Sequence, residues 1–98
     1  MKENDTKKKL RKDSLESEEN EIMLYEVLSD QEDILYVGAG PLKSMLSEHL
    51  DEGVFPMPDG TYYRTYRMYT GCDMEKRRRS LIEDHEEITG RKPKYNHD

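Results

Sequence analysis

The sequence predicts a small α+β domain in which a three-stranded, mainly antiparallel sheet is flanked by helices. Three observations carry this prediction: two short apolar runs are separated by a polar turn, two stretches show helical spacing of apolar residues, and the stretch between those two alternates as a strand does. The expected order is strand, strand, helix, strand, helix and a short tail. With 98 residues, the chain has room for one such domain.

The first two strands are expected at residues 22–28 and 34–37. Both runs contain the β-favouring residues Ile, Tyr or Val, and the polar segment 29–33 between them can close an antiparallel hairpin. Glycines at 38 and 40 permit a change of direction. Pro41 suits the first position of a helix, because an N–H group at that position would have no intrahelical partner.

The first helix is expected over residues 42–50. Its apolar residues and one histidine share a face, which indicates an amphipathic helix, and they are Leu42, Met45, Leu46, His49 and Leu50. Gly53 ends this helix, and a loop rich in proline and glycine follows.

The third strand is expected over residues 61–69, where tyrosines and arginines alternate. Asp73 offers an N-cap for a second helix, which Gly90 ends and Pro93 prevents from resuming. The stripe that defines this helix comprises Met74, Arg78, Leu81, Ile82, His85 and Ile88.

Residues 1–21 are expected to form a disordered, charged N-terminal arm, so that the folded domain spans residues 22–98. In the arm, Met1, Leu10 and Leu15 are the sizeable apolar residues among lysine, glutamate, aspartate and serine. Burial of so few apolar groups does not offset the conformational entropy that ordering the segment would cost.

Cysteine and apolar content indicate the compartment. Cys72 is the single cysteine, which excludes an intrachain disulfide and a cysteine-rich metal site. The basic run at residues 7–12 is not followed by an apolar segment that could act as a signal peptide or cross a membrane. We therefore expect a soluble, cytoplasmic protein without a membrane association.

The charge distribution bears on nucleic-acid binding. A net charge of −6 and a pI of about 5.1 are unfavourable for holding a long polyanion. Positive charge is nevertheless clustered, and the candidate phosphate contacts are Arg64, Arg67, Lys76, Arg77, Arg78 and Arg79. The cluster at 76–79 begins a helix, where cations oppose the helix dipole. Surface charge without a function explains that cluster about equally well.

Several motifs follow one another in the order found in a known family. Tyr25 lies in the first strand, Tyr36-Val37-Gly38 closes the second, His49 lies on the first helix, and Pro93-Lys94-Tyr95-Asn96 is near the end. In this order and spacing the chain resembles the GIY-YIG nuclease superfamily over residues 22–96. The first motif departs from the family pattern, since Met and Leu precede Tyr25 where the family has glycine and isoleucine.

The resemblance implies metal-dependent hydrolysis of phosphodiesters, with Mg²⁺ as the metal in an active enzyme. By position, it implies catalytic roles for Tyr25, Tyr36, His49 and Asn96, and the two tyrosines and the histidine would position and deprotonate a water. Each of these also has a structural interpretation, because buried tyrosines and histidines with satisfied hydrogen bonds are common in small sheets.

Two positions of the family pattern carry unsuitable residues. Met45 stands where the family has an arginine, and methionine neither carries charge nor donates to phosphate. Arg78 stands where the family has its metal-binding glutamate, and an arginine repels a cation. Glu75, one turn earlier on a similar face, is the candidate replacement ligand, and Glu83 would be another if the helix is rotated.

Three functions remain open on these residues. The first is a nucleic-acid-associated domain with a degenerate active site, in which cleavage is weakened or lost. The second is an active Mg²⁺-dependent, structure-selective DNA endonuclease that uses Glu75 or another nearby carboxylate. The third is a non-catalytic module that binds a protein partner.

Overall fold

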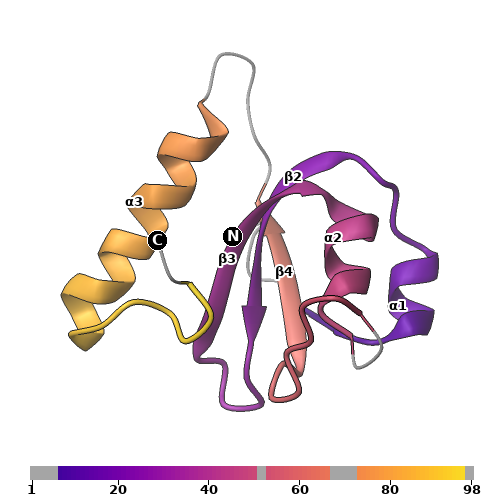
Figure 1. The fold of residues 1–98 in the computed structure, drawn as a ribbon, viewed down its shortest axis with the longest axis horizontal. Helices are drawn as coiled ribbons and strands as arrows, with labels where there is room; N and C mark the ends of the chain where they lie inside the picture. The colour runs from indigo at the N-terminus through magenta and orange to yellow at the C-terminus, as the bar shows by residue number, and fades with distance from the viewer. Residues whose placement is uncertain (1–6, 51–52, 67–72, 97–98) are drawn as a thin grey trace.

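The computed structural model describes residues 7–50, 53–66 and 73–96. A central antiparallel sheet separates one long helix from two short ones, so the fold has three layers (Figure 1). This confirms the expected α+β class. In chain order the elements are β1 (Lys8–Lys9), α1 (Lys12–Glu16), β2 (Ile22–Leu28), β3 (Ile34–Pro41), α2 (Leu42–Glu48), β4 (Tyr62–Tyr66) and α3 (Met74–Thr89).

The sheet has four strands in the order β1-β4-β2-β3, and every neighbouring pair is antiparallel. The predicted hairpin is formed by β2 and β3, in which Tyr25 lies opposite Gly38. On its other side β2 pairs with β4, which places Tyr25 opposite Thr65. The fourth strand is the two-residue β1, which pairs with β4 at Tyr62 and Tyr63.

The expectation of a disordered arm is wrong for the part of it that the structure describes, residues 7–21. These residues supply both β1 and α1, and the Leu10 N–H donates to the Thr61 carbonyl at 2.9 Å. Leu15 is 3% exposed and joins the core. Two leucines, Leu10 and Leu15, together with backbone pairing and side-chain hydrogen bonds of Glu18 and Asn20, therefore hold a segment that is otherwise highly charged.

The two faces of the sheet carry separate cores. One core lies under α1 and α2 and consists of Leu15, Tyr25, Val27, Leu35, Leu42, Leu46, Met57 and Tyr63. The other lies under α3 and consists of Leu24, Val37 and Ile82. The alternation of side chains along β2 explains this division, because neighbouring residues of a strand point to opposite faces.

The element boundaries differ from the expected ones at a few residues. Strand β3 continues beyond Val37 through Pro41, whose ψ of 111° is extended, and helix α2 ends at Glu48, so His49 lies at its C-cap and not within the helix. Helix α3 begins after the Asp73 carboxylate, which accepts from the Lys76 N–H, and ends at Gly90 with a φ of 88°. Of the expected third strand, residues 67–69 lie outside the described part of the chain.

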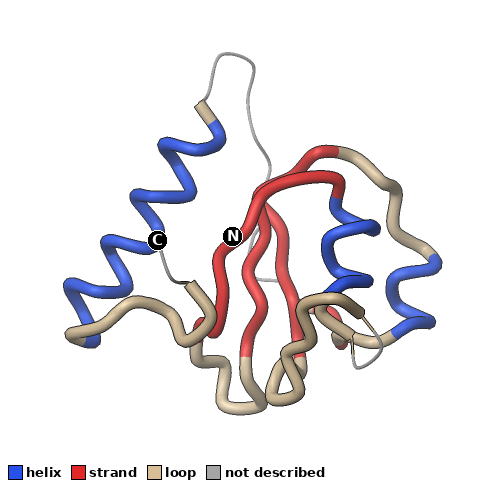
Figure 2. Tube along the Cα trace, in the orientation of Figure 1, coloured by secondary structure: helices blue, strands red, loops and turns tan. Residues whose placement is uncertain are grey.

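After α3 the chain returns to the edge of the sheet as an irregular tail (Figure 2). The Tyr95 N–H donates to the Leu35 carbonyl at 2.8 Å, so the tail lies against the outer edge of β3. In the described residues, no helix is both long and apolar enough to pass through a lipid bilayer.

Candidate functional site

A buried hydrogen bond joins two of the residues to which the resemblance assigns catalytic roles. The Tyr25 hydroxyl lies 2.8 Å from His49 Nε2, and His49 Nδ1 lies 3.1 Å from the Phe55 carbonyl oxygen. A carbonyl can only accept, so Nδ1 carries the proton. In the neutral ring Nε2 is then the acceptor, and the tyrosine hydroxyl donates to it.

Burial fixes the protonation of this pair. Tyr25 is 0% exposed and His49 is 1% exposed. Burial lowers the pKa of His49 because a charged ring loses its hydration, which keeps the imidazole neutral near pH 7. Burial also raises the pKa of Tyr25 far above its ordinary value, so its hydroxyl keeps its proton. Both groups have their hydrogen bonds satisfied inside the protein.

Tyr36, another of the four, packs beside this pair and is itself half-buried. Its ring centroid lies 5.2 Å from that of His49 and 5.6 Å from that of Phe55, both in edge-on arrangements. Such contacts are favourable between aromatic rings. The structure therefore brings Tyr25, Tyr36 and His49 together within an aromatic cluster that Phe55 completes.

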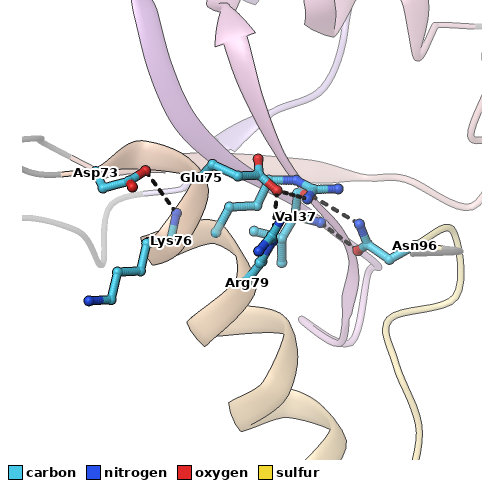
Figure 3. A network of polar contacts seen from close by, with 7 residues as sticks. Val37, Asp73, Glu75, Lys76, Arg79 and Asn96 are labelled. Atoms are coloured by element: carbon cyan, nitrogen blue, oxygen red, sulfur yellow. Dashed lines mark hydrogen bonds and ion pairs between the residues drawn. The ribbon is translucent and has the colours of Figure 1, made fainter.

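Asn96 has a different environment, on the outer edge of β3. Its side-chain oxygen accepts from the Val37 N–H at 2.9 Å, and its side-chain nitrogen donates to the Val37 carbonyl at 3.1 Å (Figure 3). The amide thus pairs with the strand edge as a neighbouring strand would. Asn96 is 5% exposed. Its described hydrogen bonds give it a structural role, which is to satisfy the backbone groups of Val37 at the edge of the sheet.

The two residues that depart from the family pattern, Met45 and Arg78, lie in well-defined surroundings. Met45 lies against Gly40 and packs on the α1–α2 core. Arg78 donates to Glu75 Oε2 at 3.1 Å, and Arg79 donates to the same oxygen at 3.3 Å (Figure 3). The Glu75 carboxylate is therefore already neutralised by two guanidinium groups.

Magnesium does not fit this geometry around Glu75. A divalent cation needs oxygen ligands, and it would have to enter beside two positive side chains that already bind the candidate carboxylate. Within the described segments, no three His, Cys, Asp or Glu side chains are grouped so that they could hold a metal ion.

The candidate phosphate contacts fall into three groups. Lys76 and Arg77 are exposed near the start of α3, whereas Arg78 and Arg79 on the same helix pair with Glu75, and the Arg78 side chain is largely buried. Arg64 instead turns to the sheet, where its Nε donates to Glu26 at 2.7 Å. Arg67 lies outside the described residues.

Glu26 is a buried charge to which the sequence analysis gave no role. Its side chain is 1% exposed, between the sheet and α3, and it is paired with Arg64. Burial and the neighbouring carboxylate of Glu26 raise the pKa of Tyr66 to about 12. A lone glutamate inside the apolar run at 22–28, opposite an arginine in an alternating strand, is the pattern that could have revealed the pair.

The buried imidazole predicts a pH-dependent stability. His49 has a lower pKa in the folded protein than the ordinary value of about 6.5 expected when unfolded, so the unfolded chain takes up the proton first. The stabilisation is complete above that pH and is lost as the pH falls, by up to about 1.4 kcal/mol per pH unit. Urea unfolding between pH 7.5 and 5.0 measures it.

His49→Gln should lose this part of the pH dependence, while His85→Gln, near the end of α3, should retain it. Equal pH profiles for the wild type and His49→Gln would show that the ring is not held neutral by the fold.

Comparison of the chain with protein-family models, with curated proteins and with solved structures gives no match.

Proposed function

We propose that this chain is a non-catalytic, GIY-YIG-like domain that associates with nucleic acid through the first half of α3. The observation that carries the loss of catalysis is the buried Tyr25–His49 hydrogen bond. A general base must reach the water that it deprotonates, but neither group is exposed, and the acceptor nitrogen of His49 is already occupied by the Tyr25 hydroxyl. The pairing of Glu75 with Arg78 and Arg79 points the same way.

The charge order of α3 supports a phosphate-binding surface. Its first half carries the exposed cations, and its second half carries the exposed acidic residues Glu83, Asp84, Glu86 and Glu87. Both halves oppose the helix dipole, which favours acids at the start and bases at the end. Pairing with Glu75 along the helix accounts for Arg78 and Arg79, whereas helix stability does not explain Lys76 and Arg77. The acidic half confines phosphate contact to the first two turns.

Binding of a labelled oligonucleotide tests this surface. Lys76 and Arg77 would each contact a phosphate, so raising the salt from 50 to 200 mM should weaken binding by about 10-fold. In fluorescence anisotropy, the double variant Lys76→Gln/Arg77→Gln should lose most of the binding at 50 mM salt. The matched control is Lys9→Gln, an exposed lysine of β1 at the edge of the sheet opposite β3, which should bind as the wild type does.

A cleavage assay tests the catalytic part of the proposal. Incubation with nicked or branched DNA and Mg²⁺ or Mn²⁺ should give no product. Cleavage that Tyr36→Phe abolishes would overturn the proposal in favour of an active endonuclease. Absence of any binding at low salt would instead favour the protein-interaction module, because phosphate contacts are strongest under that condition.

A further inference from the structure

A hollow lies between α1, α2 and the loop of residues 53–60, on the face of the sheet opposite α3. Its volume is about 630 Å³, and Leu15, Leu50 and Met57 contribute apolar surface to it. Pockets that hold small molecules commonly measure 300–1,000 Å³ and combine apolar walls with a few polar groups. In size and lining this hollow belongs to that class.

Three positively charged side chains line the hollow beside its apolar surface. Arg11 and Lys12 reach the hollow from the start of α1, and Lys43 reaches it from α2. Among the described residues that line the hollow, Glu16 is the acidic one, so these residues together carry a net charge of about +2 at pH 7. Because the whole chain has a net charge of −6, its composition does not predict a positively charged hollow.

Two of these cations form no ion pair with the residues that the structure describes. Arg11 pairs with Asp13 at 2.8 Å, whereas neither Lys12 nor Lys43 forms an ion pair with any described residue. Both lysines are exposed, so their ammonium groups stay hydrated and free to move toward a ligand. An anion at the opening would gain two charge-assisted hydrogen bonds without breaking an ion pair between described residues.

We propose that the hollow binds a small organic anion, with an apolar body against Leu15, Leu50 and Met57 and a carboxylate or phosphate between Lys12 and Lys43. This site is independent of the proposed nucleic-acid surface, because the two lie on opposite sides of the sheet. The volume accommodates a substituted single ring or a branched chain, and a long polyanion would gain nothing from the apolar wall.

Titration of ¹⁵N-labelled protein with 4-tert-butylbenzoate tests the proposal, with 4-tert-butylbenzamide as the neutral ligand of matched shape. We expect saturable chemical-shift changes in α1, α2 and residues 53–60 with the benzoate, and a dissociation constant at least about 10-fold weaker for the amide. 4-tert-Butylphenyl phosphate, titrated in the same way, shows which anionic group is preferred.

Two variants separate this site from general charge attraction. Lys12→Gln/Lys43→Gln should weaken benzoate binding at least about 10-fold and leave amide binding unchanged. Both lysines are exposed, and the free energy of unfolding by urea verifies that the fold is kept. Lys76→Gln should bind the benzoate as the wild type does, although it weakens oligonucleotide binding.

Equal affinity for benzoate and benzamide, unchanged benzoate binding in the double lysine variant, or no saturable shift up to millimolar ligand would each overturn the proposal. The oligonucleotide assay is unaffected by those outcomes, so failure of one proposal is distinguishable from failure of the other.

Discussion

Replacement of Arg64 by methionine should lower the free energy of unfolding by about 3 kcal/mol. Removal of one partner of a buried ion pair leaves the other charge without compensation, which costs about 3–5 kcal/mol. The Glu26 side chain is 1% exposed, so water cannot take the place of the guanidinium. Because the Arg64 side chain is 25% exposed, we place the effect at the lower end of that range. Urea unfolding at pH 7 measures it.

The matched control for this variant is Arg79→Met. It breaks another arginine–glutamate pair, in which the Arg79 and Glu75 side chains are 71% and 52% exposed, and it should cost less than about 1 kcal/mol. Adding Glu26→Gln to Arg64→Met should recover a large part of the lost stability, since a neutral amide is cheaper to bury than a charge. If Arg64→Met costs no more than Arg79→Met, the pair is not buried in solution.

The sequence predicts the central part of this fold because its signals there are local. A polar turn between two apolar runs predicts the β2–β3 hairpin, and helical spacing predicts α2 and α3 within a few residues. For residues 7–21 the composition predicts disorder incorrectly, because it averages over the segment and ignores the position of each residue. The burial of Leu15 and the backbone pairing of Lys8 and Lys9 both depend on β4, which is remote in sequence.

The candidate site is predicted less completely than the fold. Motif order identifies Tyr25, Tyr36 and His49 as neighbours, and the structure places them in one aromatic cluster. Their burial, and hence whether they can meet a substrate, depends on how the layers close over them. The hollow beside α1 was not foreseeable for the same reason, since one of its walls comes from the segment that composition assigns to a disordered arm.

Gly38→Ala should destabilise the protein by about 3 kcal/mol, although it adds a single methyl group. A Cβ atom at this position would lie 2.5 Å from the Tyr25 hydroxyl oxygen and 2.6 Å from a ring carbon of Tyr36. Overpacking in a core typically costs 1–3 kcal/mol, and displacement of Tyr25 would also break its hydrogen bond to His49. Urea unfolding and ¹H–¹⁵N shifts of the His49 ring measure the two effects.

The matched control is Gly90→Ala, because a Cβ there would find no atom within 4 Å, while its φ of 88° favours glycine. That variant should cost about 1 kcal/mol, through backbone strain alone. Gly38 lacks a positive φ, so its requirement for glycine is steric and comes from the ring of Tyr25 across the strand pair. A cost at Gly38 no larger than at Gly90 would contradict this. Otherwise the glycine that completes Tyr36-Val37-Gly38 serves the packing of Tyr25 against His49, and it does so whether or not the chain cleaves a phosphodiester.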